Sequence, residues 1–383
     1  MEHFDYIIAG GGASGLLLAY RLVQHPNLGK RSILILEKEP NKQNDRTWCY
    51  WEKGQGEWDD LLHARWDSVQ FKSPAYQQTI DLKPASYKMI RSESWYDFIN
   101  QALKKHPNIT FKFENVVSYK ESEEGVLVTT SDDDYVGRRL FNSILDWDTI
   151  NQQQKYPVLQ QHFLGWFVRT KAPVFDSKTA TFMDFDIPQN GHTRFMYVLP
   201  ISPTETLIEY TLFSKELLPK DEYKNALQAY LADKNITEYE IVDEEFGRIP
   251  MTCYPFSKHN TRRVLHIGSA GGWTKASTGF TFQNISRKTH ALVAHLAADR
   301  SLKSFNKKNR FWYYDLLFLD VLATHNSRGA ALFSSMFQKN KPEAIFSFLD
   351  DKSSWVQELN IMRSFPTLLF VKQLWKRLLA AVH

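Results

Sequence analysis

One glutamate within an apolar segment is the residue of this sequence best suited to donate a proton. Glu209 lies in Leu207-Ile208-Glu209-Tyr210-Thr211, and the two-residue period of a β-strand places Leu207 and Thr211 on the same face as Glu209. On a buried face the pKa of a carboxyl rises, so the group stays protonated near neutral pH and can act as an acid. The alternative is an edge strand with Glu209 facing water. Periodicity alone favours this alternative without excluding the buried acid.

A glycine-rich turn near the N-terminus has the residue types that bind a dinucleotide. Residues 10–15 read Gly-Gly-Gly-Ala-Ser-Gly, between an apolar strand at 6–9 and a helix that continues through Leu22. The first glycine allows a tight turn, the third lets a pyrophosphate approach the backbone, and the last permits close helix packing. Glu37, at the end of the next strand, is placed to bind the adenosine ribose. FAD and NAD both fit, and a turn without ligand is the alternative. The predicted contacts are Gly10, Gly12, Ala13, Ser14, Gly15 and Glu37.

An aromatic and charged block follows that second strand. Within residues 44–52, Asp45 and Arg46 form a pair that could orient a flavin or its phosphates. Three aromatic side chains of the same block could stack on a ring system: Trp48, Tyr50 and Trp51. A purely structural aromatic loop is the other interpretation.

A second loop of small residues occurs late in the chain. The apolar strand Val264–Ile267 is followed by Gly268-Ser269-Ala270-Gly271-Gly272, and then by residues 277–281. Small side chains let a ligand touch the backbone, so this loop would meet the ribityl chain and ring edge of a flavin. A flexible surface loop is the alternative. The predicted contacts are Gly268, Ala270, Thr278 and Gly279.

Near the C-terminus an amphipathic helix is predicted. Its apolar stripe consists of Leu368, Val371, Leu374, Trp375, Leu378 and Leu379, and its polar side of Lys372, Gln373, Lys376 and Arg377. Such a helix can lie in a membrane surface with its cations at anionic headgroups. Docking of the stripe onto the protein's own core is the alternative.

The elements that must position these residues indicate an α/β fold. The first forty residues read as strand, helix, strand, and the chain returns to this unit at Val264. We therefore predict a discontinuous Rossmann-like dinucleotide-binding domain, for FAD or NAD, with an inserted β-sheet substrate domain and a C-terminal helical, membrane-facing region. The ranges are 1–65, 86–150 and 255–300 for the first, 66–85 and 151–254 for the second, and 301–383 for the third.

Composition narrows the class of protein. The 383 residues are 43% hydrophobic and 23% charged, which is typical of a soluble globular chain and unlike a disordered one. The net charge of +4 is too small to argue for nucleic acid, although residues 299–383 hold 13 basic and 7 acidic side chains and so carry +6. Large aromatic residues, 26 Phe, 17 Tyr and 11 Trp, could pack a core or line an apolar cavity.

Targeting and metal signals are absent from the sequence. The two cysteines, Cys49 and Cys253, have no metal-binding spacing, so neither a disulfide framework nor a metal site is expected. The first residues lack the pattern of a signal peptide, and no apolar run reaches the roughly 18 residues of a membrane span. We expect a cytoplasmic protein that associates peripherally with a membrane.

In their order along nearly the whole chain, these segments resemble the flavin-containing lycopene cyclase family of bacterial and plant soluble-type β-cyclases. The shared segments include Met183–Phe185, Phe195–Pro200 and the Glu209-x-Thr211 element. Asp45-Arg46-Thr47-Trp48 and Glu209-x-Thr211 are more specific than the glycine turn. One departure from the wider flavin hydroxylase superfamily is Gly268-Ser269, which stands where those proteins have Gly-Asp; backbone groups of this loop could still bind flavin.

The resemblance implies a fold like that of flavin hydroxylases and geranylgeranyl reductases, with noncovalent FAD kept reduced by NAD(P)H. It implies that Glu209 is the essential acid and that lycopene or a related acyclic carotenoid is the substrate, bound among Trp48, Tyr50, Trp51, Tyr197 and Thr211. The expected reaction turns ψ end groups into β-ionone rings without net redox change. Two rivals are an FAD oxidoreductase that reduces or hydroxylates an isoprenoid, and a carotenoid-binding protein without activity.

Overall fold

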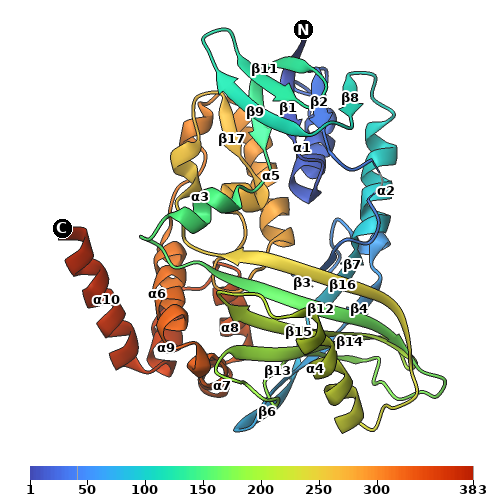
Figure 1. The fold of residues 1–383 in the computed structure, drawn as a ribbon, viewed down its shortest axis with the longest axis vertical. Helices are drawn as coiled ribbons and strands as arrows, with labels where there is room; N and C mark the ends of the chain where they lie inside the picture. The colour runs from blue at the N-terminus through green and yellow to red at the C-terminus, as the bar shows by residue number, and fades with distance from the viewer. Residues whose placement is uncertain (41, 383) are drawn as a thin grey trace.

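The computed structural model describes residues 1–40 and 42–382, and it contains a seven-stranded sheet close to the N-terminus (Figure 1). Strands β1, β2, β8, β11 and β17 run parallel; β10 pairs antiparallel with β11, and β9 pairs antiparallel with β10 at the edge of the sheet. Ile7, Ile8 and Leu34 are fully buried, as expected of parallel strands covered on both faces. The order is β8 (Ile109–Lys112), β2 (Ile33–Leu36), β1 (Glu2–Ala9), β11 (Asp134–Asn142), β10 (Val126–Thr130) and β9 (Val116–Glu121), with β17 (Val264–His266) beside β11.

Helices from distant parts of the chain pack with this sheet. Contacts join α1 to α5 and to α2, and their apolar side chains form one cluster with β1 and β2. These helices are α1 (Ala13–Gln24), α2 (Ser92–Leu103) and α5 (Phe282–Ala297). The short helix α3 (Trp147–Gln152) follows β11 and leads to the second sheet.

The second sheet also has seven strands, and Glu209 lies on one of its inner strands. Alternate residues of β15 face opposite sides: Leu207 and Phe213 join the central core, whereas Ile208 and Tyr210 pack beneath α4 (Lys220–Asp233). The order is β16 (Glu240–Met251), β12 (Leu159–Arg169), β15 (Glu205–Ser214), β14 (Thr193–Ser202), β13 (Thr179–Asp184), β5 (Ser68–Ser73) and β6 (Tyr76–Asp81). Because β15 is paired on both sides, the edge-strand arrangement that periodicity favoured is wrong.

A small three-stranded sheet lies between the two large ones in Figure 1. It brings the aromatic block next to the second half of the chain, because Thr47 at its start bonds to Glu245 of β16. The strands are β3 (Thr47–Lys53), β7 (Ala85–Arg91) and β4 (Ala64–Trp66).

Five helices at the C-terminus complete the fold and cover one face of the second sheet. Phe337 stacks on Phe71 with ring centroids 4.2 Å apart, and Phe333 stacks on Phe185 at 5.5 Å. The helices are α6 (Arg310–Thr324), α7 (Gly329–Lys339), α8 (Pro342–Leu349), α9 (Trp355–Ser364) and α10 (Thr367–Val382). The α/β fold with an added β-sheet and a C-terminal helical region is therefore confirmed.

Helix α10 packs with its apolar stripe facing away from the protein, which is the reverse of ordinary amphipathic packing. Two of its polar residues face inward, and Lys372 and Lys376 are exposed. Arg377 pairs with Asp320 of α6 at 2.6 Å, and Gln373 donates to Thr324 at 2.9 Å. The whole predicted apolar stripe is exposed, including Leu368 at 86% and Trp375 at 62%. Docking through the stripe, the alternative considered from sequence, is thus excluded. Among the described residues, no helix is long and apolar enough to cross a membrane.

Candidate active site

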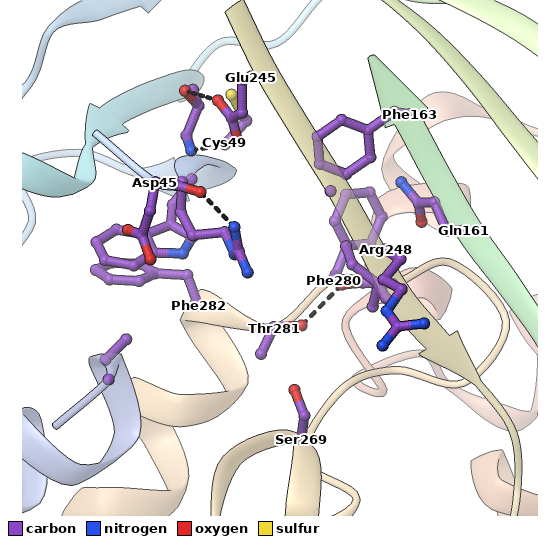
Figure 2. A pocket seen from close by; sticks show the side chains of 18 of the residues that line it. Asp45, Cys49, Gln161, Phe163, Glu245, Arg248, Ser269, Phe280, Thr281 and Phe282 are labelled. Atoms are coloured by element: carbon purple, nitrogen blue, oxygen red, sulfur yellow. Dashed lines mark hydrogen bonds between the residues drawn. The ribbon is translucent and has the colours of Figure 1, made fainter. Parts of the chain in front are cut away.

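A cavity of about 500 Å³ lies between the two large sheets (Figure 2). One wall comes from the glycine turn and the loop after β17, the other from the inner face of β12, β15 and β16. Ten of the predicted residues line it: Gly12, Ala13, Ser14, Arg46, Trp48, Tyr197, Glu209, Gly268, Thr278 and Gly279. The cavity therefore joins segments from across the chain into one site.

The glycine turn leaves room beside the start of α1. Gly10 adopts φ +95, and a Cβ at Gly15 would lie 2.2 Å from the Gly10 carbonyl oxygen, so both positions require glycine. A Cβ at Gly12 would meet nothing within 4 Å, which leaves the backbone open to the cavity. Helix α1 begins at Ala13 without a side-chain cap. Open backbone at an uncapped helix N-terminus fits the phosphates of a dinucleotide.

The carboxylate of Glu37 stabilises the glycine turn. Its carboxylate accepts a hydrogen bond from Gly11 N at 2.8 Å and pairs with Lys42 Nζ at 2.7 Å. Burial raises the pKa of this carboxyl, but Lys42 and the backbone N–H groups outweigh burial and lower it, so Glu37 is ionised. Lys42 also donates to the Gly11 carbonyl at 2.8 Å, a role that no sequence pattern indicated.

The loop after β17 closes against the same turn. Gly268 adopts φ +58, and a Cβ there would lie 2.5 Å from Ser14 Oγ; Gly279 adopts φ +74 close to Gln161. Thr278 Oγ1 and Gln161 Oε1 are buried at the cavity and have no hydrogen-bond partner among the described residues. Buried polar atoms normally have partners, so these two fit a bound ligand with donor or acceptor groups. Ala270, which belongs to this loop, is buried and does not line the cavity.

Of the three predicted aromatic residues of β3, one lines the cavity and two pack against other side chains away from it. Trp48 lines the cavity and stacks on Phe282 at 4.9 Å. Tyr50 is buried behind it, 3% exposed and stacked on Phe282 at 5.4 Å, and Trp51 packs between Phe280 and Phe346. Neither Tyr50 nor Trp51 lines this cavity, which is lined by Thr47, Trp48 and Cys49 at the start of β3 and does not extend to the residues that follow. Arg46 is exposed and donates to the Asp45 carbonyl oxygen.

Glu209 is the carboxylic acid predicted from the apolar strand. It lies level with Tyr197 of β14 and Gly165 of β12, and its side chain is open to the cavity. Thr211 Oγ1 donates to Glu209 Oε1 at 2.5 Å, from a position buried behind the cavity wall. Burial raises the pKa of Glu209 to about 8, against the Thr211 hydrogen bond and with a further contribution from the charge of Glu245. At neutral pH this side chain is an uncharged acid.

A second carboxyl on the same wall was not predicted. Glu245 of β16 is 6% exposed and accepts hydrogen bonds from Thr47 N at 3.0 Å and Thr47 Oγ1 at 2.6 Å. Burial raises its pKa, and the Thr47 hydrogen bonds oppose this. The segment Asp243-Glu244-Glu245 looks like a solvated face in sequence, and only the odd-numbered alternation with Gly247 and Ile249 marks Glu245 as inward-facing. Other cavity residues that sequence reasoning did not single out are Gln161, Phe163, Arg248 and Phe282 (Figure 2).

The fold is shared with solved structures whose names include a reductase-like protein, a flavoprotein and a halogenase. A geranylgeranyl bacteriochlorophyll reductase-like protein from Thermoplasma acidophilum superposes with a TM-score of 0.69 at 12% identity, covering 98% of this chain and 100% of that one. A flavoprotein/dehydrogenase from Cytophaga hutchinsonii gives 0.60 at 14% identity, with 98% and 100% covered. Halogenase PltM gives 0.61 at 12% identity, with 96% and 85% covered.

Sequence similarity then identifies the family. Residues 5–374 match the family model described as Lycopene cyclase protein, and this chain belongs to that family. Two lycopene beta-cyclases are similar over 258 residues: that of Pantoea ananas at 24% identity, with 65% of this chain and 63% of the relative covered, and that of Pseudescherichia vulneris at 25%, with 65% and 62% covered. The matched region thus spans less than two thirds of these relatives. The resemblance seen in the sequence is confirmed.

Proposed function

We propose that this protein is a lycopene β-cyclase, an isomerase of carotenoid biosynthesis that converts the ψ end groups of lycopene, or of a related acyclic carotenoid, to β-ionone rings. The observation that carries the proposal is Glu209, a carboxyl with a pKa of about 8 on an apolar wall opposite the glycine turn. The names of the similar proteins and the family support the substrate class.

The chemistry requires an acid that can protonate an alkene. Transfer of a proton from Glu209 to the terminal C1=C2 bond leaves a tertiary cation at C1, the C5=C6 bond attacks it, and loss of the C6 proton completes the ring. An alkene is a weak base, so the donor must be uncharged and shielded from water. Phe163, Leu199, Leu207 and Tyr197 line the wall around Glu209 and exclude water, and the two aromatic rings can stabilise a passing cation.

The same cavity suits FAD, held noncovalently. Gly12, Ala13 and Ser14 would bind the pyrophosphate, and Thr278 would meet the ring system through its unpaired hydroxyl, with Gly279 beside it at the cavity wall. Glu37 supports the turn and keeps only part of its hydrogen-bonding capacity for a ribose. Reduced flavin supplies negative charge beside a developing cation. NAD(P)H would serve as the reductant that sets this state, without consumption in each turnover.

The exposed stripe of α10 supports contact with a membrane surface, where a C40 hydrocarbon resides. Helix α10 presents leucines and Trp375 outward, and α9 adds Trp355 and Val356, at 65% and 68% exposure. A second cavity of about 180 Å³ lies next to α10, lined by Phe370, Val371 and other apolar residues, and shares Thr278 with the first cavity. This arrangement supports a path for the polyene from the membrane to Glu209 and a peripheral location at the cytoplasmic membrane face.

A second candidate function is reduction or hydroxylation of an isoprenoid by an FAD oxidoreductase, favoured by the similarity of the fold to the geranylgeranyl bacteriochlorophyll reductase-like protein. The decisive experiment is expression in a lycopene-producing bacterial host, with pigment chromatography and NADPH counted per product in vitro. Cyclisation predicts β-ring pigments and far less than one NADPH per product. Unchanged lycopene despite soluble, flavin-loaded protein would refute the proposal, and stoichiometric NADPH use would favour the second candidate.

Within that experiment, Glu209→Gln should retain flavin and lose ring formation. The amide keeps the shape and the Thr211 hydrogen bond but has no proton of suitable acidity. A variant that still cyclises would remove Glu209 from the acid role.

A further inference from the structure

Glu209 and Glu245 are placed on one face of the sheet with a single residue between them. Gly165 of β12 is paired with Glu209 of β15 on one side and with Glu245 of β16 on the other. Directly paired residues point to the same face, and two strand spacings amount to about 9.6 Å. A Cβ at Gly165 would come within 2.9 Å of Leu207 Cδ1 and 3.5 Å of Glu209 Cβ, so a glycine here leaves the row between the carboxyls uncrowded. Both carboxyls line the same cavity, and Figure 2 shows Glu245 beside Cys49.

The hydrogen-bond donors around the two carboxyls differ. Glu245 accepts a backbone N–H and a hydroxyl from Thr47, one on each oxygen, whereas the one donor recorded for Glu209 is the Thr211 hydroxyl. Hydrogen bonds donated to a carboxylate favour its ionised form, and two nearby carboxyls resist ionising together. The pair is therefore divided: Glu245 is the member that carries the negative charge, and Glu209 the member that keeps the proton.

We propose that Glu245 is the general base of the cyclisation, the group that removes the C6 proton after Glu209 has protonated C2. This role rests on the proposed function. The steps balance without a redox partner: the Glu209 O–H bond breaks as the C2–H bond forms, the C1–C6 bond forms, and the C6–H pair becomes the new C5=C6 bond as the proton passes to Glu245. Return of that proton from Glu245 to Glu209 resets the site, as an isomerisation requires.

The charged and titratable groups around the pair are consistent with this division. Burial raises the pKa of Glu245 above its usual value, and the Thr47 hydrogen bonds and the guanidinium groups of Arg46 and Arg91 oppose this rise and favour the charged form. Burial raises the pKa of the Cys49 thiol and of the Tyr87 and Tyr197 phenols, so these three are neutral near pH 7. Among these neighbours Glu245 is the carboxylate available to accept a proton.

Glu245→Gln tests the role, with Glu244→Gln as the matched control. Glu244 is adjacent on β16 but points to the other face, where it pairs with Lys220 at 2.7 Å and accepts from Trp166. The measurements are β-ring formation as a function of pH, the ring types in the product, and flavin content. Glu245→Asp serves as the charge-conserving variant.

The proposal predicts that Glu245→Gln loses about 10²-fold or more in rate, the scale of general-base catalysis. Its pH profile should lack the ascending acidic limb that ionisation of a base produces, and its descending limb should move to lower pH because the charge that raises the pKa of Glu209 is gone. The residual product should contain rings formed by proton loss from C4 or the C5 methyl group. Glu245→Asp should keep an ascending limb, shifted in pH because the shorter side chain alters the Thr47 hydrogen bonds, and should keep β-ring formation; Glu244→Gln should match the wild type.

Two results would overturn this role. One is wild-type rate and pH profile in flavin-loaded Glu245→Gln; the other is a uniform loss of rate with pure β-rings and both limbs unmoved, which indicates that Glu245 only ties β16 to β3. Should Glu245→Gln lose its flavin, Glu245→Asp decides, since a shifted ascending limb supports the role and an unshifted limb contradicts it. A wild-type protein that leaves lycopene acyclic would instead refute the proposed function itself.

Discussion

Replacing Glu209 by glutamine should stabilise the protein while it abolishes cyclisation. An unfolded chain ionises this glutamate near pH 4.5, whereas burial raises the pKa in the folded protein to about 8. The folded state therefore binds the extra proton between these values, and stability falls as pH rises through that window. At pH 7 the folded protein has lost about 3 kcal/mol of stability, because 2.5 pH units separate pH 7 from the unfolded pKa of 4.5 and each unit costs about 1.36 kcal/mol. Water in the cavity reduces this cost, and we expect about 1–3 kcal/mol.

Glutamine removes that cost because an amide does not ionise and still accepts the Thr211 hydrogen bond. Thermal unfolding of wild type and Glu209→Gln, followed by circular dichroism at pH 5 and pH 8, measures the effect. The midpoints should nearly coincide at pH 5 and differ by a few degrees at pH 8, with the variant higher. Equal midpoints at both pH values, or a variant less stable at pH 8, would show that Glu209 is ionised in the folded protein and refute the reasoning.

Three further outcomes are expected. The rate of ring formation should fall about tenfold per pH unit above pH 8, as Glu209 loses its proton, which a pH–rate profile with flavin-saturated enzyme checks. Gly12→Ala should fold normally, since its Cβ meets no atom within 4 Å, yet bind flavin more weakly in absorbance titrations, whereas Gly15→Ala, 2.2 Å from a carbonyl oxygen, should lower the melting temperature. Trp375→Asp should reduce sedimentation with anionic lipid vesicles at least severalfold, whereas Val117→Asp, on an equally exposed side chain of β9, should not.

The parts of the fold that were predictable are those with local sequence signals. The first strand-helix-strand unit follows from an apolar run, a glycine turn and a second apolar run, and the structure has β1, α1 and β2 there. Glu209 could be singled out because an acid within an apolar strand is rare enough to notice. Whether it faced water depended on the neighbours of β15, and strand order is a long-range property that period-two patterns do not contain.

Glu245 escaped prediction for the same physical reason. In sequence it is one of three consecutive acids, and such a run ordinarily marks a solvated strand. In the structure Glu244 points to the other face, and the burial of Glu245 is compensated by Thr47, a residue 198 positions earlier. Tyr50 and Trp51 illustrate the opposite limit: their residue type predicted a ligand wall, but in the structure they pack against Phe282 and Phe280 as support.

The amphipathic pattern of α10 could be predicted from the sequence. Which side of the helix contacts the protein could not, because it depends on the side chains that α6 presents. Asp320 and Thr324, one turn apart on α6, offer a carboxylate and a hydroxyl to Arg377 and Gln373, which are likewise one turn apart. This match satisfies Arg377 and Gln373 internally and leaves the leucines of α10 outside, where water contact costs free energy unless another apolar phase covers them. The same helix borders the second cavity through Phe370 and Val371. Under the proposed function, α10 would therefore both contact a lipid surface and border the path by which a polyene enters.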